Sequence, residues 1–202
     1  GQPEDAARLP GSEELLQSVD GFPALVSDPW LNGRLTALHA CSDLWACGAR
    51  VSSAMATITL PMVPANEQQE LLVQTLAGIR SVLVEQGAEL IGGHTMESRS
   101  ASPLPASLGV QIALAVNGRS SQSPWLKSGL QPGDALLISR PLGTGVLFAG
   151  AMTGATKATD LDAALKGMAC SQHKLLEQLV PLRDGIHACT DITGFGLLGH
   201  LG

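Results

Sequence analysis

The sequence predicts a mixed α/β or α+β protein. Segments with apolar residues at every third or fourth position alternate along the chain with short segments rich in β-branched residues. Glycine and proline, with 23 and 12 residues, separate these segments. Hydrophobic residues make up 45% of the 202 positions and charged residues 15%, which excludes the composition of chains that stay disordered. Strands that alternate with helices favour a sheet covered by helices.

Two long helices are expected in the first half of the chain. The first begins where Asp28 caps the helix and Pro29 takes its first position, and Gly48 ends it. The second covers about 66–86, where apolar residues recur with helical spacing and Gly87 follows the last of them.

Strands are expected between and after these helices, following an extended or loop segment that reaches Ser12. Each predicted strand is short, apolar or alternating, and bounded by turn residues. The predicted strands cover 15–19, 51–60, 88–92 and 109–116. The third is expected to be buried and to enter a long loop, GGHTMESRSASPLPAS, of a length that is typical of functional loops.

The composition changes near 118–133 to a polar segment, SSQSPWLKSGLQPGD, where we place a domain boundary. Beyond it we expect a strand at 134–139, a glycine turn at 141–145 that leads into a helix, a helix at about 160–180, and a strand at 186–190. Close packing of helices on strands explains the glycines of PLGTG and TGFGLLG as well as a ligand does.

Charge and cysteine content exclude several classes of function. The formal net charge is −6, so the chain has no excess of positive charge for a nucleic acid or an anionic membrane surface. No apolar run reaches the roughly 18 to 20 residues that cross a bilayer, and the first residues do not resemble a signal peptide. The four cysteines lack CxxC spacing and are expected to be reduced thiols in the core. We therefore expect a soluble, cytoplasmic protein.

Carboxylates at the ends of predicted strands point to a magnesium site. Asp5 and Asp20 flank the first strand, and Asp191 follows the last one. Asp43 lies in the middle of an apolar helix, where a buried carboxylate needs a cation, hydrogen-bond donors or water. Magnesium prefers oxygen ligands and commonly bridges carboxylates to phosphates. The alternatives are ordinary turn aspartates and a helix that turns its Asp43 face to solvent.

Two further patterns point less specifically to a ligand. GGHT at 92–95 offers bare backbone amides, His94 and Thr95 to a phosphate, but it matches neither GxxxxGK[ST] nor GxGxxG. His39, Asp43 and Cys47 share one helix face at a spacing of four. Transition-metal sites usually gather ligands from separate elements, so this spacing alone does not define one.

Four segments share their order and spacing with one enzyme family: DPWLNGRLTALHACSDLWACGA at 28–49, ELIGGHT at 89–95, LLISRPLGTGVL at 136–147 and CTDITGFGLLGHL at 189–201. On these segments the chain resembles the selenophosphate synthetases, also called selenide, water dikinases. TDITGFGLLGH is the most specific of the motifs. SDLWACGA and GGHT are shared in outline with the wider superfamily of ATP-using, aminoimidazole-ribonucleotide-synthetase-like enzymes.

The resemblance implies a fold and a reaction. Residues 1–118 would form an α/β domain that binds ATP and Mg²⁺ and contributes strands to a β-barrel shared by a homodimer. Residues 119–133 would be a linker, and 134–202 the start of an α+β domain. ATP, water and selenide would give selenophosphate, AMP and phosphate.

The resemblance also assigns roles to individual residues. The metal ligands would be Asp5, Asp43 and Asp191. The nucleotide would be contacted by Asp20 and Asp43, and by Gly93, His94 and Thr95 across the dimer. This agrees with the reading from the residues alone, in which carboxylates hold Mg²⁺ against a polyphosphate.

The chain departs from the family in several places. No cysteine or lysine matches the family's catalytic cysteine or selenocysteine and its lysine, and the chain stops just after GLLGH, so we expect a fragment with little or no activity by itself. His39 and, by a looser alignment, His173 stand where the family usually has asparagine. The alternatives are another ATP-dependent kinase or ligase of the superfamily and a noncatalytic nucleotide-binding or dimerisation module.

Overall fold

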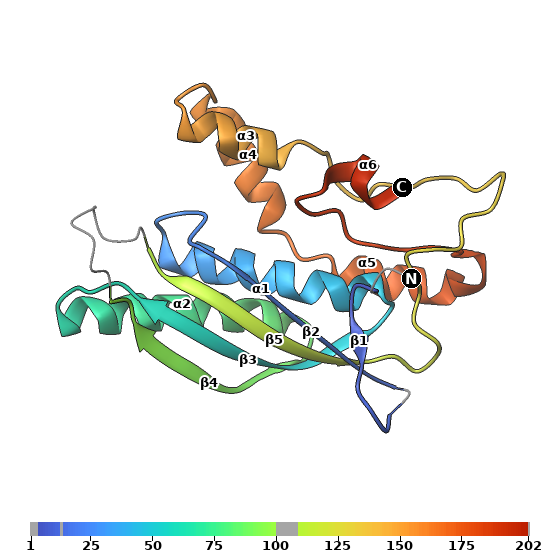
Figure 1. Ribbon diagram of the computed structural model, residues 1–202, viewed down its shortest axis with the longest axis horizontal. Coiled ribbons are helices and arrows are strands. Elements are labelled where there is room, and N and C mark those ends of the chain that lie inside the picture. Colours follow the sequence, from blue (N-terminus) through green and yellow to red (C-terminus); the bar gives the residue numbers. More distant parts are fainter. Residues whose placement is uncertain (1–3, 13, 100–108, 202) are drawn as a thin grey trace.

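The computed structural model describes residues 4–12, 14–99 and 109–201. Within these ranges five strands form one mixed sheet in the order β1-β2-β5-β3-β4 (Figure 1). The strands are β1 (Ala7–Arg8), β2 (Leu15–Phe22), β3 (Arg50–Leu60), β4 (Glu89–Glu97) and β5 (Gln111–Arg119). All neighbours are antiparallel except β3 and β4, which the helix between them makes parallel.

Two helices, α1 (Pro29–Ala46) and α2 (Ala65–Glu85), cover one face of the sheet (Figure 1). The Asp28 carboxylate accepts a hydrogen bond from the Leu31 N–H, which caps α1 as predicted. Glycine lets the two helices approach closely, because a Cβ at Gly78 would lie 2.0 Å from the Trp30 carbonyl oxygen. The core lies between these helices and the inner side chains of β2, β3 and β5.

The other face of the sheet carries exposed apolar side chains. Val19 of β2, Met55 of β3 and Ile91 of β4 are 71%, 47% and 58% exposed. Since successive side chains of a strand point to opposite faces, these residues lie on the face that α1 and α2 leave uncovered.

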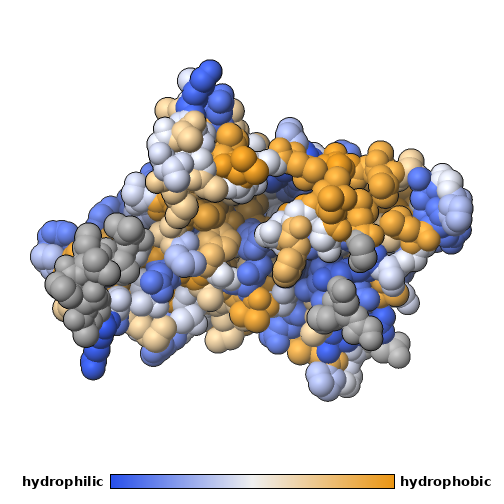
Figure 2. Space-filling view, turned by 45° about the horizontal axis from the view of Figure 1, so that its top comes forward, coloured by the Kyte–Doolittle hydropathy of each residue, from blue (hydrophilic) through white to orange (hydrophobic). Residues whose placement is uncertain are grey.

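The second half of the chain is helical and irregular. It contains α3 (Thr144–Met152), α4 (Ala158–Met168), α5 (His173–Leu179), a 3₁₀ turn (Val180–Gly185) and α6 (Gly196–Leu201). α5 reaches the core of the first half through Leu176, which is 4% exposed. Apolar side chains gather on the surface of this half (Figure 2), where Leu137, Phe195 and Leu198 are each more than 80% exposed. No helix in the described ranges is both long and apolar enough to cross a membrane.

Several predicted elements are wrong. Residues 134–139 and 186–190 are not strands, because no described strand pairs with them. The predicted helix over 160–180 is interrupted after Met168 and resumes at His173. The predicted strand at 88–92 extends to Glu97 and is an exposed edge, so GGHT belongs to a strand and not to a loop. Cys170 is exposed, whereas Cys41 and Cys47 are buried free thiols as expected.

Candidate functional site

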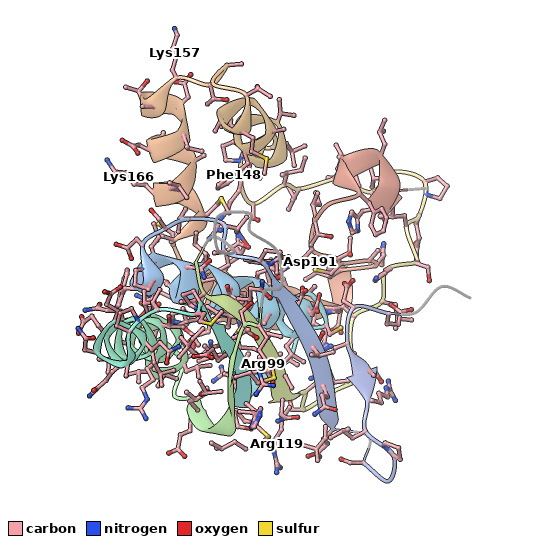
Figure 3. The ribbon with its side chains drawn as sticks, turned by 60° about the vertical axis from the view of Figure 1, so that its left-hand side comes forward. Arg99, Arg119, Phe148, Lys157, Lys166 and Asp191 are labelled. Atoms are coloured by element: carbon pink, nitrogen blue, oxygen red, sulfur yellow. The ribbon has the colours of Figure 1, made fainter. Side chains whose placement is uncertain are left out.

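Three of the predicted aspartates come together. One carboxylate oxygen from each of Asp5, Asp43 and Asp191 lies within 4.8 Å of the other two, and all three residues are at least partly buried. They come from three separate parts of the chain: the segment before β1, the last turn of α1, and the segment before α6. Figure 3 shows Asp191 beside the layer that contains α1. We call these three residues the carboxylate cluster.

A hydroxyl group lies close to each carboxylate of the cluster. The Ser18 hydroxyl of β2 donates to Asp43 Oδ2. Ser42 Oγ lies 2.6 Å from Asp191 Oδ2, and Thr190 Oγ1 lies 3.3 Å from Asp5 Oδ1. These neutral donors orient the carboxylates without cancelling their charge.

Burial and mutual repulsion raise the pKa values of Asp43 and Asp5. Burial raises the pKa of Asp43 to about 6, the Ser18 hydrogen bond opposes this, and the charges of Asp191, Asp20 and Asp5 add to it. Burial also raises the pKa of Asp5, the hydrogen bond from Lys127 opposes this, and the charge of Asp191 adds to it. Such a set of oxygen donors favours a bound hard cation, which would relieve the repulsion.

The fourth predicted aspartate, Asp20, lies next to the cluster but has a different partner. His39 Nε2 lies 2.8 Å from Asp20 Oδ2, and the Phe22 ring packs 5.2 Å from the imidazole. Burial tends to raise the pKa of Asp20, but His39 and the Gly21 N–H outweigh it and lower the pKa. The hydrogen bond to Asp20 raises the pKa of His39. The two groups therefore form an ion pair when His39 is protonated.

The helix-face triplet predicted from spacing is not a metal site. In the described residues, the group whose donor atoms are close enough to share a metal ion contains Asp43 but neither His39 nor Cys47. Cys47 is buried, and burial raises the pKa of its thiol to about 12. His173 begins α5, where its Nδ1 lies 2.8 Å from Ser171 Oγ.

Gly93, His94 and Thr95 lie far from the cluster in the order of the strands. They belong to β4, which is one edge of the sheet, whereas β2 is three strands away. A Cβ at Gly93 would lie 1.9 Å from the Ala56 carbonyl oxygen, so the pairing of β4 with β3 requires glycine there. Within one chain, these three residues and the carboxylate cluster do not form one site.

Lys127 also reaches the cluster, although no pattern in the sequence indicates it. Its Nζ lies 2.7 Å from Asp5 Oδ1, and the Asp5 side chain is only 4% exposed. Lys127 stands in the polar segment that we predicted to be a linker. No local signal connects it with Asp5, since their contact depends on how the chain folds back on its first residues.

Two family models match the chain. Residues 3–116 match the AIR synthase related protein N-terminal domain, and residues 131–202 match the C-terminal domain of the same family. Selenide, water dikinase from Bdellovibrio bacteriovorus is 33% identical over 200 residues, which are 98% of this chain and 54% of that protein. The chain thus spans about half the length of this curated relative.

Solved structures share the fold. Thiamine-monophosphate kinase from Stenotrophomonas maltophilia has a TM-score of 0.69 at 21% identity, with 96% of this chain and 61% of that chain covered. The hydrogenase maturation protein HypE, solved in complex with ATP, has a TM-score of 0.64 at 23% identity, with 88% and 51% covered.

Proposed function

Because the chain belongs to the AIR synthase related protein family, we propose that it uses ATP as a phosphoryl donor and that the acceptor is selenide. In this reaction ATP, selenide and water give selenophosphate, AMP and phosphate. The observation that carries this proposal is the carboxylate cluster, assembled from three distant parts of the chain. The name of the curated relative, selenide, water dikinase, supports the choice of acceptor.

The cluster fits Mg²⁺ by its chemistry. It offers three carboxylates, and the hydroxyls of Ser18, Ser42 and Thr190 already satisfy part of their hydrogen-bonding capacity. Asp5, Asp43 and Asp191 would hold the ion. When bound, Mg²⁺ neutralises the charge of the polyphosphate and so lowers the barrier to attack on phosphorus. Asp43 points into the cluster from α1, a rigid element, so its carboxylate is held in place before the nucleotide arrives.

The nucleotide site in this proposal is completed by a second copy of the chain. Asp20 and Asp43 would contact the nucleotide from one subunit, and Gly93, His94 and Thr95 from the other. The exposed apolar face of the sheet is suited to such a homodimer, because monomers seldom leave a contiguous apolar face open to solvent.

The proposal assigns metal and nucleotide binding to this chain, but not the activation of selenide. No position here matches the cysteine or selenocysteine and the lysine that the resemblance gives to selenide chemistry. We assign residues 1–118 to the nucleotide-binding and dimerisation domain, 119–133 to a linker, and 134–202 to part of the second domain.

Calorimetric titration with ATP, with and without Mg²⁺, tests the proposal. We expect binding that requires Mg²⁺ and that Asp43→Asn abolishes. Asp162→Asn, on the exposed side of α4, removes the same charge outside the cluster and should change nothing. Selenide-dependent release of AMP would establish selenide as the acceptor. Absence of turnover would not point to another acceptor, because no position here matches the cysteine and lysine that the resemblance gives to selenide chemistry. Mg²⁺–ATP binding that Asp43→Asn does not affect would refute the site.

A further inference from the structure

Lys127 is held beside the carboxylate cluster by the backbone around it. Its N–H donates to Glu4 Oε2 at 2.9 Å, next to Asp5 in the chain. The two preceding residues make backbone hydrogen bonds to the other two parts of the chain that supply the cluster. These bonds are Trp125 N–H to the Cys47 carbonyl at 3.1 Å, and Cys189 N–H to the Leu126 carbonyl at 3.0 Å.

Each of these contacts leads to a member of the cluster. Cys47 directly follows α1, which carries Asp43, and Cys189 stands two residues before Asp191. The same three segments that assemble the carboxylates therefore also position the backbone of Lys127. The fold therefore places the ammonium group of Lys127 beside the cluster.

The side chain is also able to leave. Lys127 is 32% exposed, whereas the Asp5 side chain is 4% exposed. A lysine has four rotatable bonds, so its ammonium can swing into solvent while its backbone stays fixed. Asp5 lacks this freedom, and its carboxylate stays in the cluster whichever cation it faces.

We propose that Lys127 is a tethered counter-cation that competes with the divalent cation for Asp5 and so sets the affinity of the cluster for metal. This inference rests on the proposed function, since it assumes that the cluster binds a metal. The ammonium group orients the Asp5 carboxylate before the metal binds. A divalent cation then has to displace the ammonium or bind beside its charge.

The ammonium group of Lys127 is expected to weaken the binding of a divalent cation. An ammonium group a few ångströms from a divalent cation weakens its binding, and even with the screening of water the effect is about tenfold. The hydrogen bond to Asp5 and the nearby carboxylates raise the pKa of Lys127, so the ammonium keeps its charge at neutral pH. Arginine at this position would keep the charge, whereas methionine would keep much of the length without it.

The test is a titration of the protein with Mn²⁺ in the absence of nucleotide. Binding is measured by calorimetry and by the loss of the electron paramagnetic resonance signal of free Mn²⁺. Lys127→Met should bind Mn²⁺ about tenfold more tightly than the unaltered protein, and Lys127→Arg should bind close to the original affinity. Lys166→Met removes the same charge from α4, away from Asp191 (Figure 3), and should leave the affinity unchanged.

The outcomes separate this inference from the proposed function. Equal Mn²⁺ affinity in the Lys127→Met and unaltered proteins, with binding still lost in Asp43→Asn, would overturn the role of Lys127 and leave the metal site in place. Weaker Mn²⁺ binding in Lys127→Met would also overturn the role of Lys127 as a competitor, because it would show that Lys127 stabilises the metal site. Absence of Mn²⁺ binding in both proteins would overturn the metal site and this inference together.

Discussion

Replacing Asp43 with asparagine is expected to stabilise the metal-free protein at neutral pH while it abolishes metal binding. The carboxylate is costly in the fold because it is half-buried and faces Asp191, Asp20 and Asp5, and one hydrogen bond from Ser18 does not offset this. An asparagine still accepts the hydrogen bond from Ser18 but carries no charge. Residues that serve a function are often kept at such a cost to stability.

The size of the gain follows from the pKa. The pKa of Asp43 rises from its usual 3.8 to about 6. Each pKa unit corresponds to about 1.36 kcal/mol, so the gain in the free energy of unfolding has an upper limit of roughly 3 kcal/mol. Solvent screens the half-buried carboxylate, so we expect about 1–2 kcal/mol. For a chain of this size that gain raises the melting temperature by roughly 3–6 °C.

The raised pKa of Asp43 determines the pH range in which Asp43→Asn stabilises the protein. The folded protein holds the Asp43 proton more tightly than the unfolded chain, so the cost of the carboxylate is fully present above pH 6. The cost shrinks as the pH falls from about 6 towards 3.8, and below that both states are protonated. Asp43→Asn should therefore gain stability at pH 7.5 and gain almost nothing at pH 4.

Urea denaturation in EDTA at pH 7.5, 6 and 4 measures this effect, with Asp162→Asn as the control for a change of net charge. A loss of stability in Asp43→Asn at pH 7.5 would refute the reasoning. A gain of equal size at pH 7.5 and pH 4 would also refute it, because the gain would then not come from ionisation of the carboxyl group.

Three other predictions concern the helices, the ion pair and the sheet. Gly78→Ala should destabilise the protein by about 3 kcal/mol in urea denaturation because α1 leaves no room for a Cβ, whereas Gly167→Ala, with open space around it, should stabilise α4 by about 0.5–1 kcal/mol. Asp20→Asn should lower the pKa of its histidine partner in an NMR titration, and a histidine pKa that does not move would contradict the pairing. Val19→Asp on the open face of the sheet should convert a dimer to monomers in sedimentation, whereas Val84→Asp, equally exposed on α2, should not.

The elements that the sequence predicts correctly are those with local signals at their ends. Asp28 and Pro29 begin α1, and the glycines at 48 and 87 follow the ends of α1 and α2. These signals act within one helical turn, so they do not depend on the rest of the fold. The strand over 134–139 failed for the opposite reason. An apolar run becomes a strand only if a partner lies beside it, and the described residues supply none.

GGHT shows how tertiary contact overrides propensity. Glycine is a poor strand former, and two glycines in succession favour a loop. In the structure, Gly93 pairs with Ala56 of β3. The Ala56 carbonyl oxygen lies where a Cβ would stand, so only glycine allows the two strands to approach this closely. The glycine is thus explained by the close approach of two strands, which no local pattern reveals.

The candidate site was predictable in its chemistry but not in its pairing. Carboxylates beside predicted strands indicated Asp5 and Asp191, although the strand expected before Asp191 is absent from the described residues, and a carboxylate inside an apolar helix indicated Asp43. Two pairings depend on contacts between residues remote in sequence: Asp20 with His39, and Lys127 with Asp5. Such contacts follow from topology and not from spacing.

The choice of partners around the cluster explains how a repulsive group of carboxylates remains available to a metal. Ser18, Ser42 and Thr190 contribute hydroxyls, which orient the carboxylates and leave their negative charge in place. Cationic partners on all three carboxylates would have cancelled that charge and with it the affinity for a divalent cation. With hydroxyls alone, protons would compete more strongly, as the pKa of about 6 at Asp43 shows. A single tethered ammonium on Asp5 lies between these extremes: it opposes the rise in the pKa of one carboxylate yet can give way to an ion that carries twice its charge.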